Sequence, residues 1–199
     1  MANSKKQQLL FAALELFVKQ GISNTSTASI AQAAGVASGT LFHHFTNKQG
    51  LIDALYRWVK EGMSDGLVTS LNLLKQNSDA LDHQTYQEAL FRLWFESMNW
   101  AVTHPLHTRF FYRYYQNQQV TPSLQSNLEN RMLQQLEEVL MLGAKNGWLL
   151  DMPMDLLRHH CYQMYLSTSQ FFLEQPHLWQ NPNYQQSAFK CFLQSIERA

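Results

Sequence analysis

The sequence predicts an all-α protein of about nine helices, with a small three-helix unit at the N-terminus and a larger helical body after it. Apolar residues recur at helical spacing along the chain, and no segment alternates apolar and polar residues as a half-buried strand does. Residues that begin or end helices separate these segments. Hydrophobic residues make up 45% of the chain, which is enough for a sizeable core. The expected helices cover about 5–20, 28–34, 37–45, 47–75, 83–104, 105–117, 121–143, 153–175 and 182–198.

The first two helices have clear start and stop residues. Ser4 and Gln7 form a capping-box pattern before the first helix, and Gly21 is a natural end for it. Side-chain oxygens in the segment 24–27 can accept the unpaired N–H groups at the start of the second helix, and Gly35 ends it. The third helix begins two residues later.

Asparagine and proline residues divide the rest of the chain. Asn47 is the expected N-cap of the fourth helix, and the segment 76–82 is a loop. The fifth helix is apolar nearly all round, which is typical of a central buried helix, and Pro105 separates it from the sixth. Cap-plus-proline pairs begin the seventh and ninth helices, and Pro153 begins the eighth.

The second and third helices form a predicted helix-turn-helix. Ala31 is small enough to let the two helices approach, and Gly35 permits the positive φ of a tight turn. The third helix would then be the recognition helix, whose N-terminal residues enter the major groove of DNA. Leu41 and Phe45 lie four residues apart and face the core. The residues left on the surface are Phe42, His43 and His44.

Within the segment 10–55, residues 12–17 read "AALELF" and residues 21–55 read "GISNTSTASIAQAAGVASGTLFHHFTNKQGLIDAL". It keeps the spacing I-A-x-x-A-G-V-x-x-G-T-L-[YF]-x-H-F-x-x-K-x-x-L, and in this it resembles the DNA-binding domain of TetR/AcrR-type transcriptional regulators. A second stretch, "WFESMNWAVTHPLH" from Trp94 to His107, is similar to some multidrug-efflux repressors of that family. The charge distribution agrees with a polyanionic partner, since residues 1–62 have a net charge of +3 and the remainder −3.

The resemblance implies a sequence-specific DNA-binding regulator and not an enzyme. We expect a repressor that binds a palindromic operator as a dimer and is released by a small hydrophobic ligand. An alternative is a DNA-binding regulator that senses a protein partner or thiol oxidation instead. We expect residues 1–47 to form the DNA-binding domain and residues 48–199 to form the domain for ligand binding and dimerisation.

The resemblance also assigns contacts with double-stranded DNA. Helix N-termini and an ammonium group attract phosphates. The residues that would contact the DNA backbone are Thr25, Thr27, His44 and Lys48. The residues nearest the bases would be Ala37, Ser38, Gly39, Thr40 and His43. The chain departs from the family where Ala37-Ser38 replaces Ser-Lys and where Phe42 replaces Tyr, so a cap, a charge and a hydroxyl are missing. Ser38 and Phe42 are expected to contact thymine methyl groups instead.

Aromatic and methionine side chains are concentrated in the middle of the body, and they can line an adaptable apolar pocket. For any single aromatic, plain core packing is the alternative. The expected ligand-binding residues are Trp94, Met98, Phe110, Tyr114, Trp148, Tyr162 and Tyr165. If the ligand is a cation, the candidate acids are Glu96, Glu137 and Glu138.

The segments 153–175 and 182–198 are expected to pair with their copies in a second chain as a four-helix bundle. Two-fold symmetry would double the short DNA site that one recognition helix can read. The candidate contacts are Leu157, Tyr165, Ser169, Phe172, Phe189, Phe192, Leu193 and Ile196.

Several other classes of protein are not indicated. No apolar run reaches the roughly 18 residues that a membrane span needs, so we expect a cytoplasmic protein. No CxxC pair, paired metal-ligand spacing or glycine-rich phosphate loop is present, so we expect no metal, cofactor or catalytic site. Two cysteines, Cys161 and Cys191, are interpreted as packed thiols, although Cys161 is the candidate if the protein senses oxidants.

Overall fold

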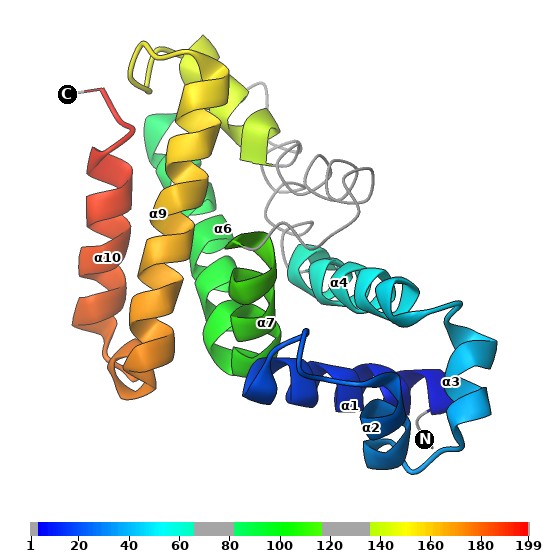
Figure 1. The fold of residues 1–199 in the computed structure, drawn as a ribbon. Coiled ribbons are helices and arrows are strands. Elements are labelled where there is room, and N and C mark those ends of the chain that lie inside the picture. The colour runs from blue at the N-terminus through cyan, green and yellow to red at the C-terminus, as the bar shows by residue number, and fades with distance from the viewer. Residues whose placement is uncertain (1–3, 66–81, 117–135, 199) are drawn as a thin grey trace. The chain divides into compact units, whose positions relative to one another are not determined.

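The computed structural model of the chain describes residues 4–65, 82–116 and 136–198 (Figure 1). These residues are almost entirely helical, which confirms the all-α prediction. Within them the elements are α1 Lys5–Gln20, α2 Thr27–Ala33, α3 Ser38–His44, α4 Lys48–Asp65, α6 His83–Thr103, α7 Pro105–Gln116, α9 Met154–Glu174, the 3-10 helix η1 Pro176–Gln180, and α10 Pro182–Gln194. A further helical stretch covers residues 136–145. The predicted helix residues 66–75, the loop at 76–82 apart from Asp82, and the predicted start of the seventh helix lie outside the described residues.

Two compact units are distinguished by the contacts within the chain. Unit 1 comprises Met1–Glu61 with Pro105–Ser126, and unit 2 comprises Gly62–His104 with Asn127–Ala199. Unit 1 is therefore assembled from two separate stretches of sequence. The predicted boundary between residues 47 and 48 separates a DNA-binding domain from a domain for ligand binding and dimerisation. It is defined by function and not by contacts within the chain, and it stays a prediction.

The core of unit 1 is built around α1. The predicted capping box starts this helix: the backbone N–H of Gln7 donates to Ser4 Oγ at 3.3 Å, and the backbone N–H of Ser4 donates to Gln7 Oε1 at 3.1 Å. Phe17 is buried and stacks on Phe110 of α7, with ring centroids 6.3 Å apart. The guanidinium of Arg113 donates to the carbonyl of Val18 at 2.7 Å, near the end of α1. Helix α7 is thus an integral part of this unit.

The core of unit 2 forms around α6, which is buried on several sides as its sequence predicted. Helix α9 packs against α6, and α10 lies beside α9 (Figure 1). Trp179 of η1 is buried, and its indole N–H donates to Asn99 Oδ1 of α6 at 3.2 Å. Phe172 meets the same indole edge-on, with centroids 4.9 Å apart. The turn between α9 and α10 is therefore fixed onto the central helix.

The end of the chain differs from the prediction of a helix to residue 198. Helix α10 ends at Gln194, and the chain then pairs with the segment before α9 through an antiparallel bridge between Leu149 and Glu197. The N–H of Leu150 donates to the carbonyl of Ile196, and the N–H of Arg198 donates to that of Trp148, both at 2.9 Å. Ile196 is fully buried by this arrangement, which a continued helix would not allow.

Among the described helices, none has the length and apolar character that crossing a lipid bilayer requires.

Candidate DNA-binding motif and ligand cavity

The loop between α1 and α2 is held by its own hydrogen bonds. Gly21, at φ +86°, ends α1, and its N–H donates to the carbonyl of Phe17 at 3.0 Å. The hydroxyl of Thr25 donates to the carbonyl of Gly21 at 2.7 Å, and Thr25 is only 1% exposed. Thr25, which was predicted to help bind a phosphate, is thus placed inside the loop and shapes the backbone that carries Thr27.

The predicted helix-turn-helix is present between α2 and α3. Ser26 is the N-cap of α2, and its hydroxyl oxygen accepts the N–H of Ser29 at 3.0 Å. Ala31 is buried against α3, and Gly35 adopts φ +65° in the turn. The N–H of Val36 closes the turn by donating to the carbonyl of Ala31 at 3.0 Å. Ser26 was not singled out by the sequence, although Ser before Thr at a helix start is an ordinary capping signal.

Helix α3 presents the side chains that the sequence placed on its surface. Leu41 is fully buried and Phe45 is 4% exposed, so the opposite side of the helix is open. Phe42 is 52% exposed, which is an unusual position for a large aromatic ring. The other exposed or half-buried positions are Ala37, Ser38, Gly39, Thr40, His43 and His44. Ala37 is the N-cap and makes no side-chain cap, as expected from its missing hydroxyl.

Lys48 connects the start of α4 to the loop before α2. Asn47 caps α4, as predicted: its side-chain oxygen accepts the N–H of Gly50 at 2.8 Å. The Lys48 ammonium donates to the carbonyl of Ile22 at 2.6 Å. A surface hollow lies between these segments, and it is lined by Ser23, Asn24, Thr25, Ser26, Thr27, Phe42 and Lys48. Hydroxyls, an amide and one ammonium without an acidic side chain suit an anion such as a DNA phosphate.

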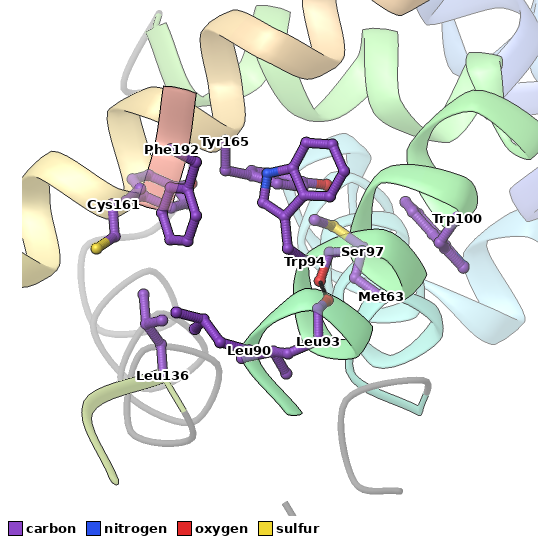
Figure 2. Close-up of a pocket in the computed structure, with 11 residues that line it drawn as sticks. Met63, Leu90, Leu93, Trp94, Ser97, Trp100, Leu136, Cys161, Tyr165 and Phe192 are labelled. Atoms are coloured by element: carbon purple, nitrogen blue, oxygen red, sulfur yellow. Dashed lines mark hydrogen bonds between the residues drawn. The ribbon is translucent and has the colours of Figure 1, made fainter. Parts of the chain in front are cut away.

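A separate, apolar cavity of about 80 Å³ lies inside unit 2 (Figure 2). Its walls come from the N-terminal part of unit 2, from α6 and α9, and from α10. The lining residues are Met63, Leu90, Leu93, Trp94, Ser97, Trp100, Leu136, Cys161, Tyr162, Tyr165 and Phe192. The α6 members Leu90, Leu93, Trp94, Ser97 and Trp100 stand at i, i+3, i+4, i+7 and i+10, and this helical spacing is a signal by which the sequence could have indicated them.

The structure brings three of the predicted ligand residues to this cavity, namely Trp94, Tyr162 and Tyr165. Met98 is fully buried in the core of unit 2, and Phe110 is buried in unit 1 against Phe17. Trp148 packs elsewhere, between the rings of His83 and Tyr86 at centroid distances of 5.2 and 5.1 Å. The side chain of Tyr114 lies outside the described residues.

Ionisable groups around the cavity have clear environments. Burial raises the pKa of the Cys161 thiol to about 12, so the thiol is protonated at neutral pH. Protonated buried thiols react slowly with oxidants, which disfavours Cys161 as a sensor. Glu137, considered for a cationic ligand, pairs with Arg158 at 2.9 Å. Neither Glu96 nor Glu138 is among the described residues that line the cavity.

Helices α9 and α10 expose large apolar side chains on their outer surfaces. Leu156 and Phe171 on α9 are 52% and 43% exposed, and Tyr184 on α10 is 41% exposed. Phe171 and Tyr184 stack at a centroid distance of 6.4 Å. Several residues that were predicted to contact a second copy are not on this outer surface but are buried within the protomer, namely Leu157, Ser169, Phe172, Phe192 and Ile196. Helical spacing alone did not distinguish the outer face from the inner one.

Two histidines of unit 2, His160 and His104, have protein partners. His160 is within 2.9 Å of Ser195 Oγ, and the His104 ring nitrogen is 3.1 Å from the carbonyl of Trp100. In the described part of the chain, no three His, Cys, Asp or Glu side chains are grouped as a metal site would require.

Comparison with known proteins gives consistent matches. Residues 9–55 match the family model described as bacterial regulatory proteins, tetR family. A putative tetR family transcription regulator from Shewanella sp. PV-4 has a crystal structure that superposes with a TM-score of 0.85, at 32% identity over 99% of this chain and 100% of that one.

Two curated regulators are also similar. The HTH-type transcriptional regulator BetI of Escherichia coli is 25% identical over 189 residues, which cover 82% of this chain and 95% of BetI. The HTH-type transcriptional repressor KstR2 of Mycobacterium tuberculosis is 28% identical over 101 residues, which cover 45% of this chain and 50% of KstR2.

Proposed function

Because this chain belongs to the TetR family of bacterial regulatory proteins, in which it is a DNA-binding transcriptional regulator, we propose that it is a ligand-controlled repressor. In this proposal two copies bind a palindromic operator through α3. A small hydrophobic molecule in the cavity of unit 2 then lowers the affinity for that operator. The observation that carries the proposal is the exposed α3 surface beside a hollow that suits a phosphate.

The residues on and beside α3 have separate roles in DNA binding. Thr27 and Lys48 border the hollow and would hold a backbone phosphate, with the loop built by Thr25 keeping them in position. The exposed residues of α3 would face the bases: Ala37, Ser38, Gly39, Thr40, Phe42 and His43. His44 would contact the backbone. Phe42 lines the hollow and is half exposed, so it can reach a thymine methyl beside the bound phosphate.

The test separates phosphate contacts from base contacts. Lys48→Ala should weaken binding to all DNA sequences alike and lower the slope of log K against log salt by about one unit. His43→Ala should instead change which operator variants are preferred, at about 1–3 kcal/mol per base contact. Lys145→Ala, at an exposed residue outside α3, α9 and α10, is the matched charge control and should leave both quantities unchanged. If operator binding is unaltered in both Lys48→Ala and His43→Ala, these residues do not contact DNA as proposed.

Release by a ligand requires a difference in affinity between two conformations. The ligand must bind the conformation that has low DNA affinity more tightly, since otherwise it shifts nothing. Linkage then makes the operator weaken ligand binding by the same factor by which the ligand weakens operator binding. Two members of the predicted ligand set, Trp94 and Tyr162, are almost completely buried yet border empty space, which supports a ligand role for the cavity.

A further inference from the structure

The walls of the unit 2 cavity carry no formal charge. Eleven described residues line it, and none of these is Asp, Glu, Lys, Arg or His. Three have hydroxyl groups, one has a thiol, and the rest are hydrocarbon, thioether or indole. An ion that entered this space would lose its hydration without gaining an opposite charge from the described walls.

The groups that could have supplied a charge are neutral or engaged. Glu137 is bound to Arg158 at 2.9 Å, and both side chains are about one-third exposed, so this pair is satisfied at the surface. The Cys161 thiol is buried and its pKa is raised to about 12, so it presents no thiolate to a cation. The described residues that line the cavity are therefore all uncharged at neutral pH.

One polar group in the wall lacks a partner. Trp94 packs against Trp179 and Phe189, at centroid distances of 6.1 and 5.6 Å, which fixes the plane of its ring. The residue as a whole is 6% exposed, its indole nitrogen is not one of the fully buried polar atoms, and the N–H donates to no group in the described part of the chain. An indole N–H in the cavity wall that has no acceptor from the described residues can donate to a ligand oxygen. Ser97 differs, because its hydroxyl already donates to the carbonyl of Leu93 at 2.7 Å.

On the basis of the proposed function, we infer that the effector is an uncharged apolar molecule that carries an acceptor oxygen, such as a hydroxyl, ketone or ester, for the indole N–H of Trp94. The hydrocarbon part of this molecule contacts the leucines and the aromatic rings of the wall (Figure 2). About 80 Å³ is smaller than the roughly 300–1,000 Å³ of a drug-sized pocket, so a ligand enters by displacing wall side chains. Met63 is the adaptable one, since its thioether chain has several rotatable bonds.

The experiment compares ligands of one shape and different charge. The probes are 1-adamantanol, 1-adamantanecarboxylate and 1-adamantylammonium, with cyclohexanol, cyclohexanecarboxylate and cyclohexylammonium as a smaller set. Dissociation constants are measured by ligand-observed NMR on the full-length protein at pH 7. In the set that fits, the alcohol should bind at least about tenfold more tightly than either ion, because only the ions must be stripped of charge hydration. An ion that binds as tightly as the alcohol, or a failure of all six to bind, overturns the inference.

Two variants test the roles of the named groups. Trp94→Phe keeps an aromatic ring but removes the N–H, and it should weaken the alcohol by about fivefold while leaving the ammonium probe, which has no acceptor, unaffected. Ser97→Asp places a carboxylate in the wall and should reverse the order, so that the ammonium probe binds most tightly. Ser97→Asn is the uncharged control of similar size and should retain the preference for the alcohol. If Ser97→Asp leaves the ammonium probe as weak as before, the cavity is not where these probes bind, and the inference fails.

Operator binding is measured in parallel, so that the two claims fail separately. If the unliganded protein binds no operator, the proposed function is wrong, whatever the probes do. If the alcohol binds by the expected order but the operator affinity is unchanged, the ligand class stands and release by the ligand does not. If operator release occurs with the charged probes instead, the regulator is ligand-controlled but the inferred chemical class is wrong.

Discussion

The two thiols of the chain have opposite environments. Cys161 is 3% exposed inside unit 2, and burial raises its pKa to about 12, whereas Cys191 on α10 is exposed. Since the thiolate is the reactive form, protonation and burial both slow the reaction of Cys161.

We therefore predict that a disulfide reagent such as dithionitrobenzoate modifies one thiol per chain rapidly at pH 7.5, and that Cys191→Ser abolishes this fast phase. The Cys161 phase should appear on unfolding in denaturant. Below its raised pKa the folded protein keeps Cys161 neutral. A fast phase that survives in Cys191→Ser but not in Cys161→Ser would contradict this and would reopen oxidant sensing.

Gly143 is a position where one added carbon cannot fit. A Cβ atom there would lie 2.6 Å from Cζ of Tyr86 and 2.9 Å from Cγ of Leu149, and it would overlap the Tyr86 hydroxyl. Both neighbours are almost completely buried and have little room to move.

We predict that Gly143→Ala lowers the free energy of unfolding by about 1–3 kcal/mol in urea denaturation, as overpacked cores do. Gly39→Ala in α3 is the control, since no atom lies within 4 Å of its added Cβ. Replacement of a helical glycine by alanine should stabilise the protein by up to about 1 kcal/mol. Equal effects of the two substitutions would show that crowding at Gly143 is relieved.

The role of a residue was predictable where helical spacing alone decides whether its side chain is buried or exposed. It was less predictable for a hydroxyl group, which can bind either a DNA phosphate or the protein's own backbone. Leu41 and Phe45 point inward as predicted, which leaves Phe42 and His43 exposed. Thr25 carries the hydroxyl expected of a phosphate contact, but the positive-φ turn at Gly21 directs it into the loop. The spacing of residues in the sequence does not indicate in which direction the Thr25 hydroxyl points.

At the scale of helices, local capping determined the boundaries that the sequence predicted well. Ser4 and Asn47 act on N–H groups three residues away, so their effect is visible in a short window of sequence. The end of α10 depends instead on Ile196, which is buried by residues near Leu149. A non-local partner of this kind overrides helix propensity, and no short window of sequence reveals it.

Asp82 provides a prediction for the start of α6. Its carboxylate accepts the N–H of Thr85 at 2.7 Å, and this backbone hydrogen bond lowers the pKa of Asp82 from its ordinary value. A carboxyl whose folded pKa is depressed stabilises the folded state fully above its unfolded pKa, and it loses that effect as the pH falls through the folded pKa.

Asp82→Ala should therefore lower the Tm at pH 7, and the difference from the parent protein should shrink as the pH falls from about 5 to 2. Asp82→Asn keeps an N-cap oxygen without a titrating charge, so its Tm difference should change little over that range. Thermal unfolding followed by circular dichroism measures both. A constant difference for Asp82→Ala at all pH values would show that the cap does not depend on its charge.

At the scale of the whole molecule, the outer surface of α9 and α10 is the proposed interface between two copies. Leu156 and Phe171 are fifteen residues apart, about four helical turns, so they lie on nearly the same side of α9. Exposed apolar side chains such as the stacked Phe171 and Tyr184 are typical of an interface. Phe192, by contrast, is buried in the protomer and Phe189 packs partly buried against the same core, so charges at both positions would disturb folding.

We predict that Phe171→Asp combined with Tyr184→Asp gives monomers in sedimentation velocity and loses tight binding to the full palindrome. The half-sites should lie about 34–36 Å apart, one DNA turn from centre to centre. Met141→Asp, at a residue 56% exposed and outside both helices, is the control and should remain dimeric. Monomers that bind the full palindrome as tightly as the parent protein would contradict the interface.

The cavity shows the limit of prediction at this scale. Aromatic density indicated a pocket in the body, and Trp94, Tyr162 and Tyr165 do line one. Phe110 was included because its segment is equally aromatic, yet α7 belongs to unit 1. Which aromatics meet depends on how helices distant in sequence pack, and composition does not contain that information.

The discontinuity of unit 1 has a consequence for the order of events during protein synthesis. A ribosome releases the chain from its N-terminus, and compact N-terminal domains often fold before the rest has been made. Here the stacking of Phe17 on Phe110 and the hydrogen bond from Arg113 to Val18 cannot form until α7 has left the exit tunnel. By then all of α6 has been translated as well. The nascent chain thus completes unit 1 only after α6 has been made, so a chain truncated before α7 lacks the contacts that α7 makes with α1.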